Sequence, residues 1–149
     1  MITDDLELAL IDFGHACDLY QTQTRTVGTD CYAPPEVLNN DEYCPAFVDS
    51  FCLGVSMFLI FFGTKPWADE RDKCYKYEAL LNDDFDYFFF GCHRGHGKPW
   101  EMLNVIWDCI EIERPYARPH INDLMSFPVF QNVTLTDAIR EDICRFLPN

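Results

Sequence analysis

The feature that most constrains the fold is an apolar run, "FCLGVSMFLIFFG", from Phe51 to Gly63. It is shorter than the roughly 20 apolar residues that a helix needs to cross a bilayer, so we expect no membrane segment. A helix that is apolar around most of its circumference is normally buried at the centre of a domain. We therefore predict a central helix over 47–62 that ends at Gly63. A buried strand is the alternative, although the run is long for one.

Composition limits the classes of protein to which the chain can belong. Its 149 residues suffice for one domain with a core, and 48% of them are apolar, so we expect the chain to fold. The formal net charge of −14 repels phosphate backbones, which argues against nucleic acid as a partner. No block of basic residues marks a membrane-surface site.

The eight cysteines raise the question of disulfides or a zinc site. No two of them are spaced as Cys-x-x-Cys, and the sequence shows no secretory leader, so we expect a reduced, cytoplasmic chain. The one metal-like cluster is "GCHRGHG", with Cys92, His93 and His96. It lacks a second pair of ligands at zinc spacing, and its glycines suit a loop, so a plain connector is the preferred interpretation.

The other segments predict a small hairpin, a long loop and a mostly helical body. "ITDDLELALI" predicts two short strands about a turn, and residues 14–34 form a polar loop that is rich in threonine. A short helix opened by proline should follow at "PPEVLNN". Further helical patterns lie at about 68–81, 99–112, 119–126 and 135–146.

Five short motifs occur in one order along the chain. Asp-Phe-Gly follows the second predicted strand, "GTDCYAPPE" ends the long loop, and "DSFCLG" opens the apolar helix. "GTKPW" closes that helix, and "RPYARPHINDLMSFPVF" follows near the end. In this order and spacing they resemble the C-terminal lobe of a eukaryotic protein kinase of the serine/threonine type, from the Asp-Phe-Gly motif onward.

The resemblance implies a mainly α fold, a protein-kinase-like C-lobe fragment with a short β-hairpin at its N-terminus. Within one partial kinase domain over 1–149, it assigns the hairpin and the aspartate to 1–12, the activation segment to 13–36 and the helical C-lobe to 37–149. The implied activity is transfer of the γ-phosphate of ATP to protein hydroxyls, with a protein as substrate or partner.

By this resemblance, Asp12, Phe13 and Gly14 contact ATP and Mg²⁺ in the complete domain. Phosphoryl transfer needs a cation that offsets phosphate charge, and hard Mg²⁺ prefers carboxylate oxygen, so Asp12 is the expected metal ligand. Phe13 would insert into the core and fix the direction of that carboxylate. Gly14 would let the backbone swing between active and inactive states. Taken alone, the three residues would indicate only an ordinary turn after a strand.

The long loop resembles an activation segment. Thr22, Thr24 and Thr26 are candidate phosphorylation sites, where a phosphate would order the loop by pairing with arginine. For any one of them, a solvated loop threonine is the simpler interpretation. Gly28 and Thr29 resemble the segment that seats the substrate residue.

Three further residues have structural roles in the family. The resemblance implies a buried ion pair between Glu36 and Arg118, whose loss would cost roughly 3–5 kcal/mol because the remaining charge would stay buried and unpaired. Asp49 resembles the carboxylate that holds the backbone of the catalytic loop from the start of the central helix.

The family's catalytic loop, His-Arg-Asp with its Lys and Asn, lies upstream of this region, so we expect no catalytic residue within the chain. Counting back from Asp12, the metal-binding Asn would fall about one or two residues before Met1. No Gly-x-Gly-x-x-Gly occurs in the sequence either. Because positioning supplies most of this catalysis, we expect residues 1–149 to be inactive alone.

Three hypotheses remain open. The first is that the sequence is part of a serine/threonine kinase whose upstream half lies outside it. The second is a truncated, pseudokinase-like module that presents its helical surface to a partner. The third is an unrelated helical domain with chance motifs, in which Glu36 and Arg118 would not meet. We favour the first, because the central helix would otherwise leave a large apolar face open.

Overall fold

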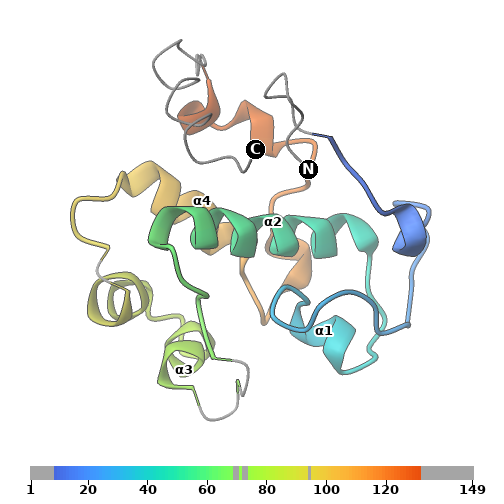
Figure 1. The fold of residues 1–149 in the computed structure, drawn as a ribbon, viewed down its shortest axis with the longest axis horizontal. Helices are drawn as coiled ribbons and strands as arrows, with labels where there is room; N and C mark the ends of the chain where they lie inside the picture. The colour runs from blue at the N-terminus through green and yellow to red at the C-terminus, as the bar shows by residue number, and fades with distance from the viewer. Residues whose placement is uncertain (1–8, 69–70, 72–73, 94, 132–149) are drawn as a thin grey trace, which may run out of the picture.

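The computed structural model describes residues 9–68, 71, 74–93 and 95–131, and helices dominate this part of the chain (Figure 1). The α-helices are α1 (Pro35–Leu38), α2 (Pro45–Phe62), α3 (Tyr75–Leu81) and α4 (Trp100–Cys109). The shorter helical turns are η1 (Phe13–His15), the π-helical η3 (Tyr87–Cys92), η4 (Pro115–Ala117), η5 (Leu124–Ser126) and η6 (Pro128–Phe130). The expected mainly α architecture is confirmed.

Helix α2 crosses the middle of the molecule, and α4 lies against it (Figure 1). Phe51 and Phe58 of α2 are completely buried in the main apolar cluster, together with Ile106 of α4. The two helices approach closely at Gly54, where an added Cβ would lie 2.6 Å from the Cβ of Cys109. The absence of a side chain at this position therefore permits the central crossing.

The predicted central helix is confirmed, and it begins two residues earlier than expected, with Pro45 in its first turn. It ends at Gly63, whose φ of 68° is the left-handed conformation that favours glycine and whose N–H donates to the carbonyl of Leu59. With 18 residues, α2 is long and apolar enough to span a membrane by length and composition, which corrects the estimate from the shorter apolar run. Core helices of soluble proteins share this composition, and the packing of α2 against α4 favours a core helix.

The other predicted helices are only partly confirmed. The proline-opened helix is present as α1, whereas α3 and α4 are shorter than the patterns over 68–81 and 99–112. A helix over 119–126 is wrong, since this stretch contains turns and the short η5. His120 gives one reason, because its Nδ1 accepts the backbone N–H of Asn122 and competes with helical bonding. The pattern at 135–146 lies outside the described residues.

The predicted N-terminal hairpin also lies mostly outside the described residues. Its described end, 9–12, forms no strand, and Leu10 and Ile11 are exposed. The one β-bridge in the described part of the chain joins Gln23 to Tyr43 in antiparallel fashion. A strand needs such a partner for its backbone groups, and no bridge of this kind involves 9–12.

Candidate functional site: the activation segment and its anchors

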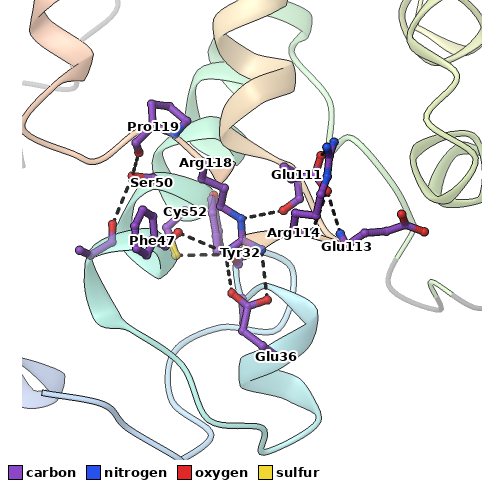
Figure 2. A network of polar contacts seen from close by, with 12 residues as sticks. Tyr32, Glu36, Phe47, Ser50, Cys52, Glu111, Glu113, Arg114, Arg118 and Pro119 are labelled. Carbon is purple, nitrogen blue, oxygen red and sulfur yellow. Dashed lines mark hydrogen bonds and ion pairs between the residues drawn. The ribbon is translucent and has the colours of Figure 1, made fainter. Parts of the chain in front are cut away.

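Glu36 of α1 and Arg118 after η4 form a buried, bidentate ion pair (Figure 2). Nη1 of Arg118 lies 2.5 Å from Oε1 of Glu36, and Nη2 lies 3.1 Å from Oε2. The same guanidinium donates to the carbonyls of Glu111 and Phe47, and it lies 4.8 Å from the ring centroid of Phe51. The ion pair implied by the sequence is therefore present, and it joins α1, α2 and the loop after α4.

The segment in front of α1 forms a tight turn on the surface of α2. The carbonyl of Thr29 accepts the N–H groups of Tyr32 and Ala33, at 2.9 Å and 3.2 Å. Gly28, with a φ of 87°, lets the chain enter this turn. The thiol of Cys52 donates to the carbonyl of Tyr32, and burial raises the pKa of this thiol to about 11, so it remains a donor at neutral pH. The expected substrate-seating segment is thus folded into a turn that is bonded to α2 at Tyr32.

Asp12 lies at the start of η1, in the left-handed region with a φ of 63°. Its Oδ1 accepts the N–H of Gly14 at 3.2 Å, and the carboxylate is exposed. Such a carboxylate has the hard-oxygen chemistry that Mg²⁺ prefers. No group of three or more metal-ligating side chains occurs among the described residues, Asp12 included.

The structure corrects the expected position of Phe13. Its side chain is 70% exposed rather than inserted in the core. The apolar clusters in the described part of the chain are built on α1, α2, α4 and the segments that pack on them, and none includes Phe13. The ring of Phe13 therefore lies outside the apolar core of the described residues.

The predicted activation segment is attached to the chain that follows α1. Gln23 and Tyr43 exchange two backbone hydrogen bonds of 2.9 Å, and the Tyr43 hydroxyl donates to the carbonyl of Arg25. All three candidate threonines are exposed, but Thr26 also donates to Asn40 and to the end of α1. The three candidate threonines thus differ in their surroundings, because Thr26 is already anchored.

A cavity of about 310 Å³ lies between the predicted activation segment and the first turns of α2. Its wall includes His15, Cys17, Thr29, Asp49 and Cys52. Asp49 is on the exposed side of α2, and the neighbouring protein atoms displace enough water to raise the pKa of its carboxyl. The residue expected to support the catalytic loop therefore faces an open space beside the activation segment.

The two histidines of the cysteine–histidine cluster pack against different aromatic rings. His93 is buried against the rings of Phe58 and Phe88, and His96 packs against Phe90. Sequence reasoning missed another basic residue, Arg71, whose side chain contacts the substrate-seating segment. No motif marks this arginine, and only the folded chain shows its partners.

Comparison with known proteins agrees with the geometry. Residues 1–130 match the family model described as protein kinase domain. The chain is similar to the serine/threonine-protein kinase SRK2B of Arabidopsis thaliana, with 34% identity over 67 residues, which cover 44% of this chain and 19% of that protein. It is equally similar to the serine/threonine-protein kinase SAPK5 of Oryza sativa subsp. japonica, with 34% identity over 67 residues, 44% of this chain and 18% of that protein. The matched segment thus spans about a fifth of the length of these relatives.

Proposed function

The chain belongs to the protein kinase domain family, and from this premise we propose that its protein transfers the γ-phosphate of ATP to serine or threonine hydroxyls of other proteins. The observation that carries the proposal is the buried pair of Glu36 and Arg118. This pair ties the end of the activation segment to the α2–α4 core, and a protein substrate needs a rigid seat at that place. The names of the similar plant kinases support the serine/threonine type.

Asp12 has the role of metal ligand in this proposal. When Mg²⁺ and ATP are bound, the cation offsets charge on the phosphates. The exposed carboxylate of Asp12 would hold that cation, and its bond from the Gly14 N–H restrains the direction of the carboxylate. Gly14 keeps the turn compact, since a Cβ there would approach Oδ1 of Asp12 to 3.2 Å.

Residues 28–36 have the role of the substrate seat. The turn at Thr29 presents a fixed backbone edge, which can align a peptide so that its hydroxyl lies near the metal-bound phosphate. The cavity beside Asp49 would receive the catalytic loop of the complete domain. Acid–base chemistry at the substrate hydroxyl would come from that loop, because residues 1–149 contain no His-Arg-Asp.

We propose that residues 1–149 do not transfer phosphate on their own. The test compares this segment with the full-length protein that contains it, using ATP labelled at the γ-phosphate and casein as the substrate. We expect incorporation of label by the full-length protein and none by the segment. No labelling by either protein would favour the alternative, a pseudokinase-like binding module.

We also propose that the protein works in the reducing cytoplasm. The seven cysteines of the described residues are free thiols, which is consistent with this compartment.

A further inference from the structure

Arg71, between α2 and α3, reaches back to the substrate-seating segment. Its Nη2 donates to the carbonyl oxygens of Asp30 at 2.5 Å and Ala33 at 2.9 Å, which lie 41 and 38 residues away in the sequence. We propose that Arg71 is a positioning residue, which holds the backbone of residues 29–33 in the shape that accepts a protein substrate. This inference rests on the proposed kinase function.

The position of the guanidinium is set by the rigid core. It lies 4.9 Å from the ring centroid of Trp67 and 5.6 Å from that of Tyr77, and both rings are buried. Trp67 in turn packs on Phe51 of α2, at a centroid distance of 5.8 Å. The attraction between the cation and the two aromatic rings fixes where the guanidinium lies. Because Trp67 packs on α2, Arg71 holds the turn at a set distance from α2.

The two carbonyls that Arg71 binds lie in the turn closed by Thr29. Within this turn, the carbonyl of Thr29 accepts the amides of Tyr32 and Ala33, and Arg71 binds carbonyls that these bonds leave unused. Hydrogen bonds from a charged donor to carbonyl oxygens are stronger than neutral ones. Arg71 therefore restrains the same turn through two of its carbonyl groups.

Arg71 also forms part of the wall of a cavity of about 470 Å³ together with Gly28, Thr29 and Lys65. Loosening the turn would change the shape of this cavity, which lies directly beside the proposed seat of the substrate. The effect of Arg71 should consequently fall on binding of the protein substrate rather than on binding of ATP.

Two substitutions separate the role of the guanidinium donor from those of charge and packing. Arg71→Met keeps a long apolar side chain over Trp67 and Tyr77 but removes every donor. Arg71→Lys keeps the positive charge and an ammonium donor, but it loses the flat guanidinium that lies over Trp67 and Tyr77 and sets the position of Nη2. Arg114→Met is the matched control, because the side chain of Arg114 is 70% exposed and its ion pair among the described residues is with Glu111.

The first measurement is hydrogen exchange of backbone amides in the full-length protein. In Arg71→Met we expect the amides of Tyr32 and Ala33 to exchange at least about tenfold faster, with a smaller change in Arg71→Lys. The amide of Ile110 in the core should exchange as in the wild type. Unchanged exchange at Tyr32 and Ala33 in Arg71→Met would overturn the proposal, and Arg71→Lys provides the same comparison if the methionine variant does not fold.

The second measurement is steady-state phosphate transfer by the same variants. We expect the KM for the protein substrate to rise about tenfold in Arg71→Met while the KM for ATP stays within about twofold. An equal rise in both constants, or none, would overturn the positioning role. If the wild type itself transfers no phosphate, the kinase proposal fails, and the exchange experiment still decides whether Arg71 holds the turn.

Discussion

Glu36 and Arg118 lie 82 residues apart in the sequence, yet their side chains meet in a buried pair with two hydrogen bonds of 2.5 Å and 3.1 Å. Arg118 is 2% exposed, so its charge has little water around it. The carboxylate of Glu36 and the carbonyls of Phe47 and Glu111 together satisfy the guanidinium. This pair connects α1, at the end of the proposed activation segment, to the α2–α4 core.

Removal of one partner of this pair should destabilise the fold strongly. Glu36→Gln leaves the guanidinium of Arg118 buried without a countercharge, which should lower the free energy of unfolding by about 3–5 kcal/mol. The double variant Glu36→Gln/Arg118→Met should lose less than the sum of the single variants, because no buried charge remains unpaired. Urea denaturation measures both, with Arg114→Met as the exposed control. Additive losses would contradict a buried pair.

His93 should make the stability depend on acid pH. Its ring is buried against Phe58 and Phe88, and Nε2 has no hydrogen-bond partner among the described residues. Burial, with a smaller effect from Lys76, lowers its pKa to about 4. Between pH 6.5 and 4 the unfolded chain therefore binds a proton that the folded chain does not, so the free energy of unfolding falls as the pH falls.

The measurement is urea denaturation of wild type and His93→Phe at several pH values between 7 and 4. The stability of the wild type relative to the variant should decline by at most about 1.4 kcal/mol per pH unit over this window. His96→Phe, at an exposed position, should not change the slope. Parallel pH profiles for the wild type and His93→Phe would show that His93 does not titrate as described.

The close crossing of α2 and α4 should not tolerate a methyl group at Gly54. An added Cβ would lie 2.6 Å from the Cβ of Cys109 and 2.9 Å from Cγ2 of Ile110. Gly54→Ala should therefore lower the free energy of unfolding by about 1–3 kcal/mol, although alanine favours helices. Ser56→Ala, on the same helix, is the control and should be nearly neutral. A more stable Gly54→Ala protein would rule out this crossing.

The isolated segment should expose apolar surface along α2. Ile60 is 80% exposed and Leu53 is 38% exposed, and the two lie about two helical turns apart on this apolar helix. We expect residues 1–149 to bind a hydrophobic dye or to express poorly, and Leu53→Lys/Ile60→Lys should reduce the dye signal. A monomeric, cooperatively melting segment without dye binding would contradict this expectation.

The central helix and the long-range ion pair could be predicted because their signals are local and specific. The run from Phe51 is apolar on nearly every side, and Gly63 supplies the conformation that ends a helix. Glu36 and Arg118 each lie in a short motif with family-like spacing, so the resemblance could connect residues that no periodicity connects.

Other features depend on tertiary contacts that a sequence pattern does not carry. The stretch over 119–126 has apolar spacing, but the bond between His120 and Asn122 favours turns. The motif predicts a buried ring at Phe13, but burial depends on which segments pack against η1, and the ring is exposed. Arg71 lacks any pattern, and its role appears only when α2 and the Thr29 turn come together.

The most direct test of the central claim is phosphate transfer by the full-length protein with Asp12 intact and with Asp12→Asn. Asp41→Asn, at another exposed position, controls for the loss of one carboxylate. If these residues form the helical half of a kinase, the wild type and Asp41→Asn label serine or threonine, and Asp12→Asn labels neither. Equal labelling by all three proteins would contradict the assignment of Asp12 to the metal and, with it, the proposed mechanism.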